Sequence, residues 1–162
     1  MAKVILTKGY VPIIGTGLAR MGNVHIQDLT QAYVLLVEAA LAGDASPELW
    51  GARGYHLTVT GEHTWGPLAR AMAAEARAMG LLKGGKAGQE GEGEEEEPLE
   101  EHLMSREEAL ETAGFEALSW GLNARCKGLR LAKFLGWKAE HPSLEDEIPG
   151  IVKSEAKRLG LL

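Results

Sequence analysis

The sequence predicts a mixed fold that is mainly helical with a few short strands. Apolar residues recur at helical spacing in several segments, whereas only short runs alternate or favour strands. With 162 residues, 45% of them apolar, the chain is long enough to bury the core of one domain. We therefore expect an α/β chain (α+β when taken alone) that forms a single lobe over residues 1–162.

The first two predicted helices cover residues 27–42 and 65–79. In the first, apolar side chains recur every three or four residues, Asp28 lies in the first turn and Gly43 follows the end. In the second, Thr64 can accept hydrogen bonds from the free amides of the first turn. Each helix carries an apolar stripe, so both are expected to cover the core.

Three further helices are predicted in the second half of the chain. The segment Ser105–Glu108 is a capping box that opens a short helix ending at Gly114. Asn123 can cap another helix that buries Cys126 and Leu129 and ends before Gly136.

The last helix can begin near Ser143 or near Glu147, and the second start is favoured because it would place Pro149 in the first turn, where proline is best tolerated. Strands are expected at 10–14, 23–26 and 55–60. The last of these runs alternates strictly between apolar and polar residues.

Charge and composition exclude several function classes. Residues 83–98 are rich in Gly and Glu and lack large apolar side chains, so we predict a flexible insertion there. The net charge of −6 arises from eight glutamates between residues 90 and 101, since the other 15 acidic residues are balanced by 17 basic ones. No basic stripe of the kind that binds nucleic acid is present. No apolar run is long enough to cross a membrane, and the single cysteine favours a cytoplasmic protein.

The pair of glycines at Gly15 and Gly17 does not form a dinucleotide-binding fingerprint. The fingerprint requires a third glycine where Arg20 stands, and a helix beginning there so that its amides face the pyrophosphate. The following residues, Asn23–Ile26, are instead extended in pattern.

Five motifs occur along the chain: a glycine-containing loop, a hydrophobic-His-hydrophobic segment, Asp-Leu opening a helix, a strand-turn segment before a second helix, and Leu-Gly-Trp. They are Gly15–Gly22, Val24–Ile26, Asp28–Leu29, Tyr55–Glu62 and Leu135–Trp137. Together they resemble the carboxyl-terminal half of extended or atypical short-chain dehydrogenases, the NAD-dependent epimerase/dehydratase family, and especially its fungal members. One departure is Ala139, where the family usually has proline.

The resemblance implies a substrate-binding half of a Rossmann-like protein, in which the segment after the glycine loop lines the substrate cleft. Arg20, Asn23 and His25 are then the candidate substrate contacts. The alternative is purely structural: His25 packs and bonds to the backbone while Asp28 caps the helix.

The family's catalytic tyrosine, four residues before a lysine, has no counterpart at Tyr10, Tyr33 or Tyr55. We therefore expect no catalytic and no cofactor-binding residues in this chain, although NAD or NADP serves the parent family. His56 and His63 are expected to be solvated rather than metal ligands, so no metal site is predicted.

Two functions follow from the resemblance. In the first, the chain is the substrate-binding half of an oxidoreductase, inactive alone, whose partners are a small-molecule substrate and a missing N-terminal Rossmann half. In the second, it is a non-catalytic binding or scaffold protein derived from that lobe. Exposed apolar surface and strand edges make self-association possible in either case.

Overall fold

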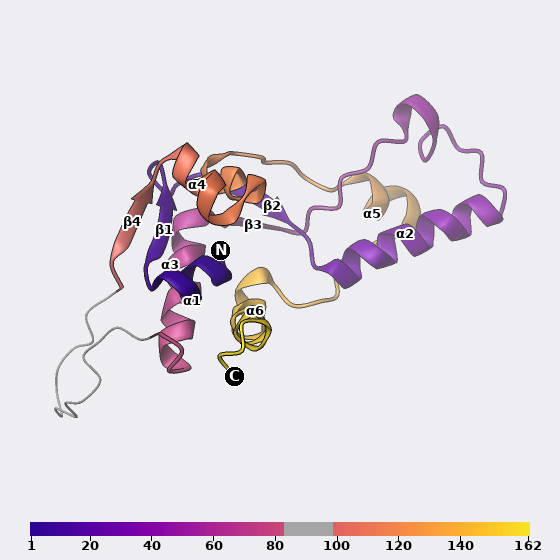
Figure 1. Ribbon diagram of the computed structural model, residues 1–162. Helices are drawn as coiled ribbons and strands as arrows, with labels where there is room; N and C mark the ends of the chain where they lie inside the picture. Colours follow the sequence, from indigo (N-terminus) through magenta and orange to yellow (C-terminus); the bar gives the residue numbers. More distant parts are fainter. Residues whose placement is uncertain (83–98) are drawn as a thin grey trace. The chain divides into compact units, whose positions relative to one another are not determined.

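The computed structural model describes residues 1–82 and 99–162, so the predicted insertion at 83–98 lies outside the described residues. The described chain is mainly helical with a few short strands, which confirms the predicted fold class (Figure 1). Its helices are α1 (Ala2–Lys8), α2 (Ile26–Leu41), α3 (Trp65–Ala78), α4 (Arg106–Ala113), α5 (Arg130–Leu135) and α6 (Leu144–Arg158). Its strands are β1 (Val11–Ile14), β2 (Arg20–Asn23), β3 (Gly61–Thr64) and β4 (Glu101–Met104), and two 3-10 turns are η1 (Gly51–Arg53) and η2 (Phe115–Gly121).

The chain divides into two compact units. Unit 1 contains Met1–Ala19, Thr64–Asn123 and Glu147–Leu162, and unit 2 contains Arg20–His63 and Ala124–Asp146. Each unit therefore combines segments that are distant in the sequence. The prediction of one substrate-binding lobe did not anticipate this division, and the role assigned to that lobe stays a prediction.

Unit 1 is built around a two-stranded parallel sheet. Strand β1 pairs with β4 from Val11 opposite Glu101 to Ile14 opposite Met104. The prediction of a strand at 10–14 is thus confirmed, whereas β4 was missed because its sequence continues the acidic run. Helix α1 was not predicted either, because its seven residues are too few to show a helical period. The side chains at the centre of this core are Val4, Met104, Ala109, Ala117 and Trp120.

Two of the predicted helix starts in unit 1 have different outcomes. At α4 the Ser105 hydroxyl accepts a hydrogen bond from the Glu108 amide at 3.1 Å, as the capping box predicts. At α3 the Thr64 side chain makes no capping bond. The amides of Trp65 and Gly66 instead donate to the carbonyls of Ala19 and Gly17, so the loop after β1 satisfies the start of α3.

Unit 2 packs α2 against α5, which confirms the helix predicted at 27–42 to within one residue at each end. Its core contains Ala32, Leu131 and Trp137. The small sheet of β2 and β3 replaces the strands predicted at 23–26 and 55–60. The run 55–60 is not a strand, and its first apolar residue, Tyr55, is exposed.

The helix predicted from Asn123 is wrong in its first half, because α5 begins only at Arg130. The preceding residues are extended: the Ala124 amide donates to the Arg20 carbonyl, and the Gly22 amide donates to the Ala124 carbonyl. Cys126 and Leu129, expected to be buried, are exposed. Backbone pairing with β2 therefore takes precedence over helix formation in this segment.

The favoured start of the last helix near Glu147 is wrong, because α6 begins directly after Ser143, the other predicted start. Ser143 Oγ donates to Asp146 Oδ2 at 2.6 Å, and the Asp146 amide donates back to Ser143 Oγ at 3.2 Å. Pro149 then lies inside α6 rather than in its first turn. The reciprocal cap at the helix start compensates for the backbone hydrogen bond that proline cannot make.

A pair of glycines offers a test of this backbone packing. A Cβ on Gly128 would lie 2.5 Å from the Leu57 carbonyl oxygen and 3.0 Å from the Val59 backbone. A Cβ on Gly150 in α6 would make only an ordinary contact, at 3.6 Å from Glu147 Oε2. We expect Gly128→Ala to lower the free energy of unfolding by about 1 to 3 kcal/mol. Gly150→Ala is expected to raise it by about 0.5 to 1 kcal/mol. Urea unfolding followed by circular dichroism compares them, and equal effects would contradict the close approach at Gly128.

Candidate functional site

The three site residues predicted from the sequence all lie in unit 2, along β2 and the entry to α2. Arg20 Nη1 lies 3.4 Å from Glu62 Oε1, and Asn23 Nδ2 donates to Nδ1 of His63 at 3.1 Å. His25 is the N-cap of α2, because its Nδ1 accepts a hydrogen bond from the Gln27 amide at 3.2 Å. Their assignment as substrate contacts stays a prediction.

His25 fulfils part of the structural alternative and adds a contact that it did not include. Its ring does bond to the backbone, so Asp28 is not the cap that the sequence suggested. The same ring stacks on His141, with centroids 4.9 Å apart and planes inclined by 8°. The two imidazoles therefore form a stacked pair, which no sequence pattern predicted.

Asp28 is the buried centre of this cluster. Its side chain points into unit 2 and the residue is only 2% exposed. Oδ1 accepts hydrogen bonds from His141 Nδ1 at 2.7 Å and from the Glu140 amide at 3.0 Å. Burial alone would raise the pKa of this carboxyl, but the bonds from His141 and from the 140–141 backbone outweigh it and lower the pKa. Asp28 is therefore held as a carboxylate.

The buried carboxylate determines how the His141 ring is presented. Because Nδ1 donates to Asp28, the neutral ring carries its proton on Nδ1 and has a lone pair on Nε2. The His141 side chain is 35% exposed, so solvent and solutes reach the ring. A carboxylate that orients an accessible imidazole is the arrangement of a general acid or base.

Trp137 stabilises the cluster of Asp28, His25 and His141. Its indole is 4% exposed, and Nε1 donates to the Asp28 carbonyl oxygen at 2.9 Å. Gly136, in the left-handed conformation at φ 66°, ends α5 and turns the chain into this segment. The Leu-Gly-Trp motif and the Asp-Leu motif thus meet in unit 2, where together they position His141.

A second polar group adjoins the predicted residues on β2 and β3. Glu62 accepts from Arg125 Nε at 2.5 Å as well as from Arg20, and the bond from Arg125 lowers the pKa of Glu62. His63 is 8% exposed, so the prediction that it is solvated is wrong, and burial lowers its pKa. His63 is therefore a buried partner of Asn23 that is held neutral.

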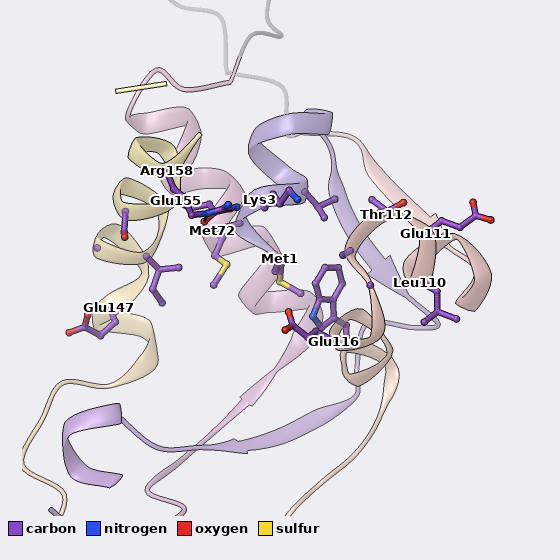
Figure 2. Close-up of a pocket in the computed structure, with 18 residues that line it drawn as sticks. Met1, Lys3, Met72, Leu110, Glu111, Thr112, Glu116, Glu147, Glu155 and Arg158 are labelled. Carbon is purple, nitrogen blue, oxygen red and sulfur yellow. Dashed lines mark hydrogen bonds and ion pairs between the residues drawn. The ribbon is translucent and has the colours of Figure 1, made fainter. Parts of the chain in front are cut away.

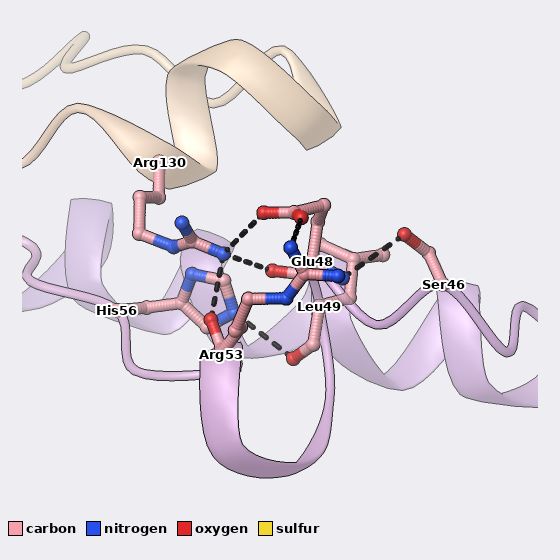
Figure 3. Close-up of polar contacts among 6 residues, drawn as sticks. All are labelled: Ser46, Glu48, Leu49, Arg53, His56 and Arg130. Carbon is pink, nitrogen blue, oxygen red and sulfur yellow. Dashed lines mark hydrogen bonds and ion pairs between the residues drawn. The ribbon is translucent and has the colours of Figure 1, made fainter.

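A third polar group fixes the loop that follows α2 to the start of α5 (Figure 3). Arg130 Nη2 donates to the carbonyls of Glu48 and Arg53 at 2.5 and 2.6 Å, while Arg53 pairs with the Glu48 carboxylate at 2.9 Å. His56 Nε2 donates to the Leu49 carbonyl at 3.1 Å, so this histidine, too, is not simply solvated. These bonds satisfy backbone carbonyls, which indicates a structural role.

Unit 1 contains a pocket of about 990 Å³, formed by residues of α1, α3, α4, η2 and α6 (Figure 2). Its wall includes the ion pair between Arg158 Nη2 and Glu155 Oε1, at 2.5 Å, and the side chain of Lys3. The bond from Arg158 lowers the pKa of Glu155. The volume suits a small molecule, but the paired charges supply no group oriented for chemistry.

The described residues do not form the arrangement that a dinucleotide or a metal ion requires. Gly15 and Gly17 lie in the turn after β1, and no helix begins there, so this turn does not fit a dinucleotide pyrophosphate. Within residues 1–82 and 99–162, no group of three or more His, Cys, Asp or Glu side chains is placed to hold a metal ion. No described helix is both long and apolar enough to span a bilayer.

Sequence reasoning missed His141 and the role of Asp28. One feature could have indicated them: Asp28 occupies the same helical face as Ala32 and Leu36, which pack into the core. An acidic residue on a buried face requires a partner with hydrogen-bond donors. The partner itself could not be identified, because it lies in a segment far along the chain.

Comparison with known proteins gives one informative match. The chain is 34% identical over 167 aligned residues to a protein named Oxidase ucsJ from Acremonium sp. The match covers 99% of this chain but only 44% of the relative, so the chain spans less than half of the relative's length. No protein-family profile matches the chain. No solved structure matches it either.

Proposed function

We propose that this chain is the substrate-binding part of an oxidoreductase-like protein, similar to the carboxyl-terminal half of NAD-dependent epimerase/dehydratase proteins, and inactive alone. Two kinds of observation support the proposal. The relative named an oxidase aligns with almost the whole chain. Two motifs of the family resemblance, Asp28–Leu29 and Leu135–Trp137, meet in unit 2, where Trp137 donates a hydrogen bond to the Asp28 carbonyl.

The observation that carries the proposal is the carboxylate-oriented imidazole of His141 beside His25. Oxidation of an alcohol and reduction of a carbonyl both require a group that exchanges a proton with the substrate oxygen. Nε2 of His141 is the ring nitrogen available to exchange such a proton, because Nδ1 is bonded to the buried Asp28 carboxylate. Arg20 and Asn23 are the end residues of β2, which leads to His25 at the start of α2, and they are the proposed substrate contacts.

The proposal assigns cofactor binding to a part outside this chain. We expect the purified chain to bind neither NAD nor NADP, because the turn at Gly15–Gly17 is not followed by a helix that could receive the pyrophosphate. Titration calorimetry with each dinucleotide measures this. Micromolar binding of either one would show that a cofactor site exists here and would contradict the proposed division of labour.

A chimaera tests the substrate-binding role. This chain replaces the 167 aligned residues of the Acremonium relative, and oxidation of the relative's own substrate is followed. We expect activity in the chimaera and a loss of at least about tenfold in kcat for His141→Asn, the usual scale of lost acid-base catalysis being about 100-fold or more. The matched control is His102→Gln, a half-exposed histidine in unit 1.

The outcomes separate the two functions. Equal activity of the His141 and His102 variants would remove His141 from the chemistry. A folded chimaera that binds cofactor but oxidises nothing would favour the non-catalytic binding or scaffold protein.

A further inference from the structure

Helix α2 has a second apolar face that the core of unit 2 does not use. Its inner face contains the buried residues Asp28 and Ala32. On the outside, large apolar side chains remain exposed, from 41% for Val34 to 83% for Leu41. These residues, which we call the outer stripe, are Ile26, Tyr33, Val34, Val37 and Leu41.

The outer stripe is continuous along the helix. At about 100° per residue, its five members fall within an arc of about 100°. Thr30 lies in the same arc, and its hydroxyl donates to the Ile26 carbonyl at 2.9 Å. Thr30 therefore presents no unsatisfied hydrogen-bonding group to a partner surface. The arc is as wide as the apolar face of a helix that packs against a protein core.

The outer stripe is also symmetrical about its centre. Ile26 and Leu41 lie equally far from the midpoint between Tyr33 and Val34, and Thr30 and Val37 do so as well. When two such helices pack antiparallel about a two-fold axis at that midpoint, Ile26 faces Leu41 of the other copy, and Thr30 faces Val37. A two-fold interface requires exactly this self-complementary arrangement.

Charge does not oppose this pairing. The only charged residues of α2 are Asp28, which is buried, and Glu38, which lies outside the stripe near the helix end. In the antiparallel arrangement the two Glu38 side chains belong to opposite ends of the helix pair, so like charges do not meet. The flanking residues Gln27 and Gln31 are polar and uncharged.

We propose that the outer stripe of α2 is a dimer interface that binds a second copy of this chain, independently of the proposed oxidoreductase role. A single pair of helices about 24 Å long buries less than the ~800 Å² per partner of a stable standard interface. The expected dissociation constant is therefore in the micromolar range, on the order of 10 to 100 µM.

Sedimentation equilibrium from about 1 to about 300 µM tests the proposal in this concentration range. Val37→Glu places a charge in the stripe while favouring the helix, and should raise the dissociation constant at least about tenfold. Gln31→Glu adds the same charge to the same helix outside the stripe, and should change it less than about twofold. Tyr33→Ser is a second stripe variant, in case Val37→Glu alters the circular dichroism spectrum.

A compensating variant tests the orientation of the two helices. Because Thr30 faces Val37 across the two-fold axis, Thr30→Lys combined with Val37→Glu should restore dimerisation through two symmetrical ion pairs. A wild-type chain that stays monomeric throughout the range would overturn the proposal. So would stripe variants that dimerise like wild type, or a Gln31→Glu variant that dissociates as much as Val37→Glu. A double variant that remains monomeric would overturn the antiparallel pairing.

Discussion

Replacement of Trp137 by alanine is expected to lower the free energy of unfolding by about 3 to 5 kcal/mol, the range measured for large aromatic side chains in protein cores. Trp137 packs with Ala32 and Leu131 in the core of unit 2 and is almost completely buried. Alanine would leave a cavity the size of an indole and remove the hydrogen bond to the Asp28 carbonyl.

Two conservative variants separate packing from hydrogen bonding. Trp137→Phe keeps most of the packing but leaves the buried Asp28 carbonyl without its donor, which we expect to cost about 1 to 3 kcal/mol. Trp50 donates in the same way to the Asp44 carbonyl at 2.6 Å, but at an exposed position. Trp50→Phe should therefore cost less than about 1 kcal/mol, because water replaces the lost donor.

The measurement is chemical denaturation of the four proteins, wild type and three variants, followed by far-ultraviolet circular dichroism. A Trp137→Ala loss of less than about 1 kcal/mol would mean that the core of unit 2 does not depend on this side chain. Equal losses for the two tryptophan-to-phenylalanine variants would contradict the burial of the Trp137 hydrogen bond.

Removal of the Asp28 carboxylate is the second large effect. Asp28→Ala leaves the Glu140 amide and His141 Nδ1 without their acceptor, and we expect a loss of about 2 to 4 kcal/mol. Asp146→Ala is the matched control, because that carboxylate accepts two bonds from Ser143 at an exposed helix start. Loss of such a cap should cost about 0.5 to 2 kcal/mol.

The effect of Asp28 should also depend on pH in a definite direction. The pKa of its carboxyl is lowered in the folded chain, so the unfolded chain takes up the proton first as the pH falls. The stabilisation is then complete above the unfolded pKa of about 4 and is lost as the pH falls through the lower folded pKa. Asp28→Asn lacks this dependence, so the stability difference from wild type should shrink below about pH 4.

The sequence predicted the helices whose residues recur at helical spacing, because that spacing shows which face packs against the core. Helices α2 and α3 each bury one face, and side chains of that face recur at helical spacing. The failed predictions concern segments whose backbone contacts residues far away in the sequence. Residues 55–60 alternate like a strand, yet their backbone lies against Gly128. Ala124, where a helix was predicted, instead pairs with Arg20 and Gly22 of β2. No local pattern encodes such backbone partners.

The candidate site was predictable in the same partial way. The family resemblance selected Arg20, Asn23 and His25, and the structure places all three in one unit along β2 and the start of α2. It did not select His141, because that residue follows the Leu-Gly-Trp motif in a segment without periodicity. An acidic residue on the core-facing side of a helix indicates that it has a hydrogen-bond partner. Only the three-dimensional structure identifies that partner.

The bond between Asp28 and His141 joins positions separated by 113 residues, and this separation has a kinetic consequence. Closing so long a loop loses chain entropy before the favourable free energy of the contact is gained. Contacts of this kind therefore form slowly and late. Changes at Asp28 or Trp137 should therefore accelerate unfolding more than they retard folding. Because the closure cost grows only logarithmically with loop length, lengthening or shortening the intervening surface loops should scarcely change how fast the imidazole pair assembles.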